Sequence, residues 1–255
     1  MDRQRKNFLR KLHSPAQSLI DRARNTFDTI IEESLIVFIA WSLALFEWMR
    51  YFFLKKMIPV PLTLVAIIVT CVYIIRLRRL SKENSSVEKG IEGEKIVGRH
   101  LEEELTPLGY YIIHDIVADN FNIDHVVIGP TGIFCIETKN WTKPTDGEHH
   151  AITSDGKRIF RDGFPVEKDV IFQATSSAKW LSRLLKQLTG RGFYVQPAVV
   201  FLNWFTITPK KPGYDLVWIL NETGIIDYIK KNFKKLSLDD TALIVAQIKN
   251  HIVQK

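Results

Sequence analysis

Three charged residues at the end of an apolar strand pair have the types and spacing for phosphodiester chemistry. Residues 122–139 read NIDHVVIGPTGIFCIETK, in which two apolar runs flank a Gly-Pro-Thr-Gly turn at 129–132. If the turn pairs its two glycines, Asp124 lies directly across from Glu137. Lys139 projects from the same face because it is two residues beyond Glu137. Like charges opposed on a sheet destabilise it, so we expect a positive group between the two acids.

A fourth charged residue, Glu94, interrupts the apolar stripe of the preceding helix. Residues three and four positions apart from Val87 to Leu105 form that stripe, and Glu94 occupies one of its positions. A carboxylate on the buried face of a helix is costly unless it is paired or binds a metal. Glu94 is therefore a candidate metal ligand. The alternative is a helix rotated so that Glu94 reaches solvent.

These acids and the lysine are the groups that hydrolysis of a phosphodiester needs. Two or three carboxylates around one point bind a hard cation such as Mg²⁺ or Mn²⁺. Such an ion lowers the pKa of its bound water and neutralises charge on the phosphoryl group. A lysine at the same site can orient or deprotonate that water, or stabilise the transition state. The two cysteines of the chain are too few for a disulfide framework or a Cys-rich zinc site.

The same motifs carry a resemblance to known nucleases. Asp124 followed by Glu137-Thr138-Lys139 resembles the D…(D/E)-x-K core of the restriction-endonuclease-like nucleases. More narrowly, the combined motifs are similar to the nuclease-related domain called NERD, over roughly residues 88–205. These motifs are GIEGE at 90–94, NIDH at 122–125, GPTGIF at 129–134, ETKN at 137–140 and the later Gln173.

The resemblance implies a fold, a set of site residues and a substrate class. The implied fold is an α/β, restriction-endonuclease-like core with the order α-β-β-β-α-β. Glu94, Asp124 and Glu137 become metal-site acids, and Lys139 becomes the catalytic lysine. Gln173 matches a glutamine that related restriction-type enzymes carry near the site, with an ordinary helix-surface amide as the alternative. The implied substrate is nucleic acid, DNA more than RNA.

Helix and strand patterns place these residues on an α/β framework. Apolar periodicity and turn signals predict a mixed sheet flanked by helices within a domain at 90–255. The predicted elements are a helix at 87–105, strands at 109–116, 123–129 and 132–139, a short hairpin around 154–156, a helix at 169–189, strands at 194–202 and 215–220, and helices at 222–232 and 238–252.

The N-terminal third predicts a membrane anchor. Two apolar runs at 34–54 and 57–75 have the length of membrane-spanning helices, within a hairpin at 33–80. Glu47 and Arg50 interrupt the first run at a spacing that lets them pair, and an interfacial helix is its alternative. A basic, amphipathic segment at 1–32 precedes the hairpin, and a polar linker at 81–89 follows it.

The net charge of +7 belongs entirely to this third. Residues 1–89 hold 15 basic and 8 acidic residues, whereas residues 90–255 hold 20 of each. Basic residues flank the two apolar runs and are sparse between them. Because positive charge marks the cytoplasmic side, we expect a two-span protein with its N-terminus and its nuclease-like domain in the cytoplasm. The expected partners are nucleic acid and the lipid membrane.

A non-catalytic function is the alternative to an enzyme, and the role of the residues after the lysine motif is also open. A nuclease fold can also serve as a non-catalytic module that binds nucleic acid or protein at the membrane. The residues that follow the lysine motif include Trp141, Lys143, Lys157, Arg158 and Arg161. These residues suit phosphate contacts and base stacking, but they also suit an ordinary solvated loop.

Overall fold

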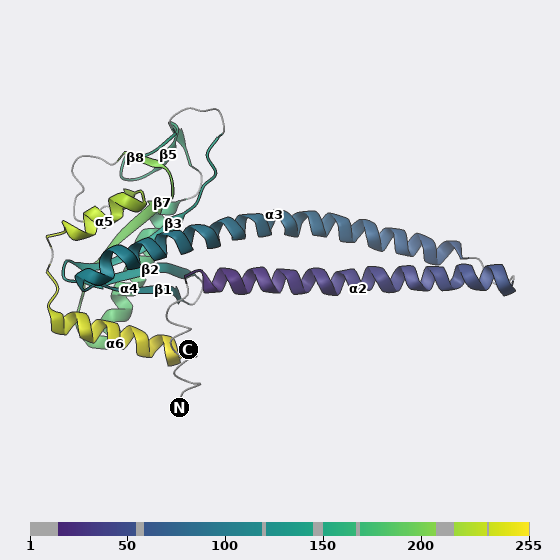
Figure 1. Cartoon of the computed structure of the whole chain (residues 1–255), viewed down its shortest axis with the longest axis horizontal. Helices are drawn as coiled ribbons and strands as arrows, with labels where there is room; N and C mark the ends of the chain where they lie inside the picture. The colour runs from purple at the N-terminus through teal and green to yellow at the C-terminus, as the bar shows by residue number, and fades with distance from the viewer. Residues whose placement is uncertain are drawn as a thin grey trace. The chain divides into compact units, whose positions relative to one another are not determined.

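The computed structural model describes residues 15–54, 59–118, 121–144, 150–166, 169–207, 217–233 and 235–254. It divides into two compact units (Figure 1). One unit is Leu19–Lys89, and the other combines the residues up to Ser18 with Gly90–Lys255. The described residues 15–18 therefore belong to the same unit as the C-terminal domain.

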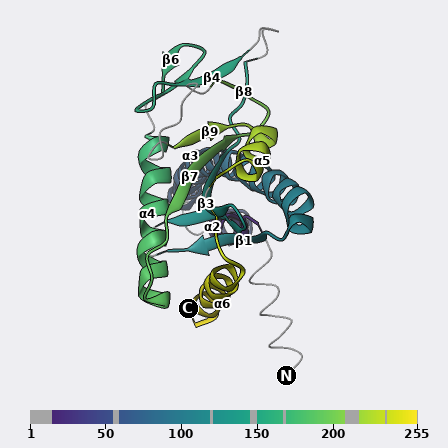
Figure 2. The same cartoon turned by 90° about the vertical axis from the view of Figure 1, so that its left-hand side faces the viewer.

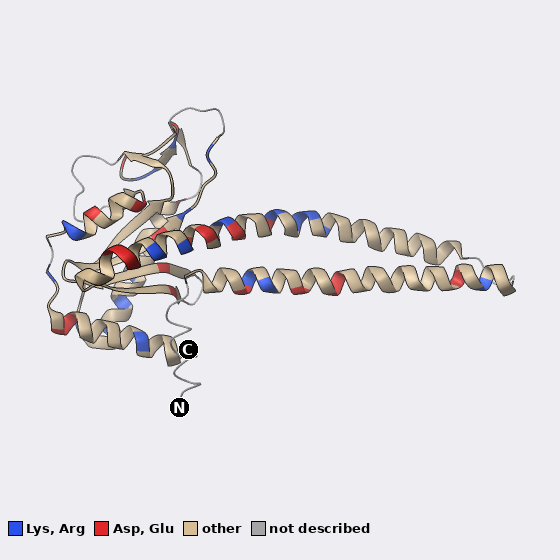
Figure 3. Cartoon of the chain, in the orientation of Figure 1, with Lys and Arg blue, Asp and Glu red and all other residues tan. Residues whose placement is uncertain are grey.

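Leu19–Lys89 is an antiparallel pair of helices made from α2 (Gln17–Leu54) and the first part of α3 (Val60–Leu105). Side-chain hydrogen bonds join Ser34 with Tyr73, Trp41 with Thr70, and Trp48 with Thr63. Most large apolar side chains of this pair are exposed, and long stretches carry no charge (Figure 3). Both helices are long and apolar enough to cross a membrane, by length and composition.

Two segments that the sequence analysis set apart from the two apolar runs are helical where the structure describes them. The linker predicted at 81–89 is helical, since α3 runs without interruption from Val60 to Leu105. This polar segment contains neither Pro nor Gly, and Asn84 donates to Glu88 at helical spacing, 3.3 Å. In the segment predicted at 1–32, residues 17–32 are helical and belong to α2. Residues 1–14, and the start of the second predicted span at 57–58, lie outside the described residues.

The C-terminal domain centres on a five-stranded mixed sheet with the order β1-β2-β3-β7-β9 (Figure 2). Strands β1, β2 and β3 are antiparallel, whereas β7 pairs parallel with both β3 and β9. This confirms the predicted α/β class. The strands are β1 (Tyr111–Val117), β2 (Asn122–Gly129), β3 (Gly132–Lys139), β7 (Val195–Phe201) and β9 (Trp218–Leu220).

The register of β2 against β3 is the predicted one. Gly129 pairs with Gly132, and the pairing continues to His125 with Ile136. Both glycines are required: Gly132 has a φ of 133°, and a Cβ on Gly129 would lie 2.2 Å from Cδ1 of Tyr110. The turn therefore fixes which residues of β2 and β3 face each other, from the glycines to the acidic end of the hairpin.

Helices cover both faces of this sheet. On one face, α3 and α5 (Glu222–Lys230) pack against Phe134 and Ile136. On the other, α4 (Val170–Thr189) and α6 (Leu238–Gln254) pack against Ile133 and Cys135. Away from α3, the predicted helices agree with the observed ones to within two residues. A short 3-10 helix, η1 (Thr106–Leu108), follows α3 and leads into β1.

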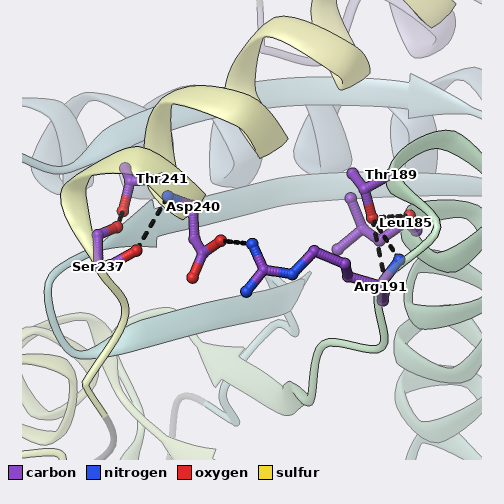
Figure 4. A network of polar contacts seen from close by, with 6 residues as sticks. All are labelled: Leu185, Thr189, Arg191, Ser237, Asp240 and Thr241. Atoms are coloured by element: carbon purple, nitrogen blue, oxygen red, sulfur yellow. Dashed lines mark hydrogen bonds and ion pairs between the residues drawn. The ribbon is translucent and has the colours of Figure 1, made fainter.

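A polar network joins α6 to the loop that follows α4 (Figure 4). The guanidinium of Arg191 donates to the carboxylate of Asp240 in the first turn of α6. The Asp240 amide donates to Ser237 Oγ, and the Thr189 hydroxyl donates to the carbonyl of Leu185. The network thus ties the ends of the two helices that share a face of the sheet.

A second sheet, with the order β6-β5-β4-β8, is attached beyond β9 (Figure 2). Its β4–β5 hairpin confirms the hairpin predicted around 154–156. The sequence patterns did not predict β6 or β8, which are two and three residues long and add an edge strand on each side. The strands are β4 (Ala151–Ser154), β5 (Ile159–Arg161), β6 (Phe164–Pro165) and β8 (Phe205–Ile207).

Candidate functional site

Glu137, Lys139 and Gln173 form a closed set of contacts at the end of β3. The Lys139 ammonium donates to Glu137 Oε1 at 2.6 Å and to Gln173 Oε1 at 3.3 Å. The Gln173 amide donates in turn to Glu137 Oε1 at 2.6 Å. Gln173 is exposed on the first turn of α4, but its side chain is engaged with both charged groups. It is therefore not an ordinary surface amide.

Asp124 lies at the matching end of β2. One of its carboxylate oxygens accepts the backbone N–H of Thr138 at 2.7 Å. The expected positive group between the two acids is thus divided: Lys139 holds Glu137, whereas a backbone amide holds Asp124. Burial, and then the carboxylates of Glu137 and Glu94, raise the pKa of Asp124 well above its usual range. The acids are therefore close enough to oppose one another's ionisation.

Glu94 reaches this site from α3 and does not point into solvent. Its residue is only 7% exposed, so the alternative of a rotated helix is wrong. Burial, then the carboxylates of Asp115 and Glu137, raise its pKa from 4.5 to about 8. Lys139 acts in the opposite direction. Four residues that the sequence predicted for one site are thus electrostatically coupled in the structure.

Ala16 and Ser18, at the start of α2, contact the acids Glu94 and Asp115, and the sequence did not predict these contacts. The backbone N–H of Ala16 donates to Glu94, and Ala16 itself is fully buried with a φ of 61°. Asp115 has a φ of 51° and accepts both the amide and the hydroxyl of Ser18, at 2.5 and 2.7 Å. Only the tertiary structure brings this segment to the site, because Ser18 and Asp115 are 97 residues apart.

A buried pair of histidines lies one position from the acids, on the side of the sheet that faces α3. His114 Nδ1 and His125 Nδ1 are 2.8 Å apart, and His114 Nε2 is 3.1 Å from Glu102 Oε1. A Cβ on Gly98 would lie 3.2 Å from each ring, so this glycine lets α3 approach the pair. Burial, then His114, lowers the pKa of His125 well below its usual range. Burial and the neighbouring ring thus favour the neutral form of His125.

The donor chemistry of the site suits a hard cation, but the side chains are not arranged around one. Three carboxylates supply oxygen atoms, and the pKa values of two of them, Glu94 and Asp124, are raised. A divalent cation beside them would lower these pKa values again. Among the described residues, no group of three or more His, Cys, Asp or Glu side chains is arranged to hold a metal ion. The Lys139 ammonium instead balances the charge of Glu137.

Comparisons with known proteins give the domain its family. Residues 89–202 match the family model of NERD, the nuclease-related domain. An uncharacterized protein of Bacillus anthracis is 40% identical over 73 residues, which are 27% of this chain. The match spans about a third, 34%, of that relative's length. No solved structure matches the chain. The matched range contains every predicted site residue, and residues 89–202 are therefore similar to the nuclease-related domain.

Proposed function

We propose that this protein is a membrane-anchored, metal-dependent nuclease that hydrolyses phosphodiester bonds, with DNA ahead of RNA as substrate. One observation carries the proposal: Glu94, Asp124 and Glu137 converge from three elements of a nuclease-related domain on a site that also holds Lys139. Buried acids of one sign destabilise a fold unless they serve a ligand, and a cation is the ligand that relieves their repulsion.

Mg²⁺ or Mn²⁺ would be held by Asp124 and Glu137 with help from Glu94, and would supply an activated water and a counter-charge for the phosphoryl group. The protein's own residues set the positions of the other charges. The Lys139 ammonium places a positive charge beside the acids, where it can stabilise the negative charge that develops on phosphate oxygens. Gln173 accepts a hydrogen bond from Lys139 and donates one to Glu137, and so fixes the positions of both side chains.

The membrane part of the proposal rests on α2 and α3. Their exposed apolar side chains have no core to join within Leu19–Lys89, and a lipid bilayer would cover them. The cluster of Arg76, Arg78, Arg79 and Lys82 follows the apolar part of α3. Such a cluster marks the cytoplasmic side, and this supports a cytoplasmic position for the nuclease-related domain.

The test is a cleavage assay with the full chain in detergent or nanodiscs. We expect Mg²⁺- or Mn²⁺-dependent cleavage of labelled DNA, and we expect Glu137→Ala and Lys139→Ala each to lower the rate by about 10²- to 10³-fold. Lys235→Ala is the control, since this exposed lysine lies far along the chain, before α6. Absence of cleavage of both DNA and RNA, or full activity in the two site variants, would falsify the proposal.

Calorimetry with Mn²⁺ separates the nuclease from a non-catalytic module. We expect wild-type protein to bind Mn²⁺ and Asp124→Asn to lose that binding, because a neutral amide is a weaker ligand for a hard cation. Metal-independent nucleic-acid binding without cleavage would instead identify a binding module built on the same fold.

A further inference from the structure

The second sheet presents an apolar face to solvent. Phe205 is 65% exposed, and Ile207 is exposed as well. Thr153 pairs with Phe160 on one side and with Ile207 on the other, so these three side chains share a face. Phe205 is two residues from Ile207 and lies on that face too. We call the surface formed by Thr153, Phe160, Phe205 and Ile207 the outer face.

The fold does not need aromatic side chains at these positions. The opposite face of the sheet already packs on the domain, because Ile152 and Ile159 are buried in a cluster with Phe201 and Trp204. An exposed phenylalanine gains nothing from the protein's own packing. The outer face therefore exposes the aromatic ring of Phe205, whereas Ile152 and Ile159 of the opposite face are buried.

Positive charges border the outer face at the turn between β4 and β5. Lys157 and Arg158 are exposed there. The Asp155 carboxylate accepts the backbone N–H groups of both residues, at 2.8 and 2.6 Å, and so shapes the turn. Within the described part of the chain, neither Lys157 nor Arg158 forms a salt bridge. Arg158 interacts electrostatically with the Asp155 carboxylate of the same turn, and Lys157 is exposed beside it, so the turn offers positive charge to an anionic partner.

The second sheet is fastened to the strand end that carries Lys139. The amide of Leu202 donates to the carbonyl of Lys139 at 3.0 Å, and Phe205 follows three residues later. The Trp204 indole donates to the carbonyl of Trp141 at 3.0 Å. The second sheet is therefore tied to the strand end that carries Lys139.

We infer that the outer face binds an unpaired strand of nucleic acid, with bases stacked on Phe205 and Phe160 and phosphates beside Lys157 and Arg158. An exposed ring, Phe205, and a half-buried ring, Phe160, share one face of a sheet bordered by cations. This arrangement matches the chemistry of single strands, whose bases offer free ring faces. A duplex keeps those ring faces stacked inside the helix. The inference rests on the proposed function, since it names the form of substrate that the acidic site receives.

The test measures binding without cleavage. The full chain in detergent is titrated with a fluorescent single-stranded oligonucleotide and with the matching duplex, in EDTA, by anisotropy. We expect the single strand to bind more tightly, and Phe205→Ala and Phe160→Ala each to weaken it about 5- to 100-fold. Phe164→Ala is the matched control: Phe164 is 76% exposed in the same sheet but pairs with Arg161, on the opposite face. We expect it to change affinity less than twofold.

Salt dependence tests the cationic border. The double variant Lys157→Ala/Arg158→Ala is expected to reduce the slope of log affinity against log salt by about 0.7 for each phosphate contact removed. Equal loss in Phe164→Ala, an unchanged affinity in Phe205→Ala and Phe160→Ala, or tighter binding of the duplex would overturn the inference and indicate a surface for another protein or for lipid. Each of these outcomes leaves cleavage by the acidic site intact. Loss of cleavage with intact strand binding would instead contradict the proposed function alone.

Discussion

In Leu19–Lys89 large apolar side chains point outward, whereas in the nuclease-related domain charged side chains are buried. Ala44 is the one buried residue among those described in α2, while Phe38 and Phe53 are exposed. In the domain, Glu94 and Glu137 are buried. Each arrangement is unfavourable in water, for opposite reasons. Under the proposed function, a bilayer would cover the apolar side chains of the first region, and a cation with its substrate would balance the buried acids of the second.

The largest effect is expected from neutralising the buried acid of α3. Folding raises the pKa of Glu94 from 4.5 to about 8, so the native state retains a proton that the unfolded chain loses. Stability therefore falls as pH rises from 4.5 to 8 and is constant above that window, and Glu94→Gln removes this loss. At pH 9 in EDTA we expect the variant to be more stable by about 2–5 kcal/mol in urea titrations.

Glu92→Gln is the matched control, because Glu92 is exposed two positions earlier on the same helix. Its pH profile is expected to follow that of the wild type. If the free energy of unfolding depended on pH in the same way in the wild type and in Glu94→Gln, the buried acid would cost the fold nothing. The domain would then contain no unfavourable burial of charge to compare with the exposed apolar helices.

A charge placed in the outward-facing apolar surface is expected to have the next largest effect. Ile68 lies in the uncharged part of α3 and is exposed. Ile68→Arg is expected to disfavour membrane insertion by about 3 kcal/mol, which shifts the protein from the membrane to the soluble fraction. Ile68→Leu should remain in the membrane. Equal membrane partition of both variants would indicate that the helices pack on a protein surface instead.

A smaller effect is expected from the amide that bridges the lysine and the acid. Gln173→Ala removes hydrogen bonds to two charged groups, and we expect about a tenfold lower cleavage rate, equivalent to ~1.4 kcal/mol. Gln187→Ala changes an exposed glutamine of the same helix and should leave the rate unchanged. Equal rates in the two variants would mean that Lys139 needs no positioning.

The smallest effect is expected from an exposed ion pair on the surface of the C-terminal domain. The Arg191 side chain is 60% exposed where it meets Asp240 (Figure 4). Solvent screens such a pair, so Arg191→Ala should lower the free energy of unfolding by about 0.5 kcal/mol, and less at high salt. Arg183→Ala, at an exposed position of α4, is the reference. A loss above about 2 kcal/mol would show that exposed charges here matter as much as buried ones.

Several features of the domain were predictable because they depend on neighbours in sequence. The Gly-Pro-Thr-Gly turn determines which residues face each other, so the register of β2 and β3 follows from the turn alone. The buried position of Glu94 follows from the apolar spacing of one helix. The functional roles of these acids stay predictions, to be tested by the cleavage assay and calorimetry.

Other features depend on contacts that a linear pattern does not contain. The helix through 81–89 continues because no residue in it stops a helix, although its polar composition resembles a linker. Strand β8 is three residues long and pairs parallel with β4, more than fifty residues earlier in the chain, so it has no local signal. The contacts of Ala16 and Ser18 with Glu94 and Asp115 also join distant segments.

The sequence alone determined the residue types, the turn and the apolar periods, because these act through the backbone over a few residues. It thereby determined the two long apolar helices, the strand pair and the acids that end it. The tertiary structure decided how those acids are held: Glu137 by Lys139 and Gln173, and Asp124 by a backbone amide. It also decided that the outer face is exposed, because burial depends on which elements pack together and not on the identity of a residue.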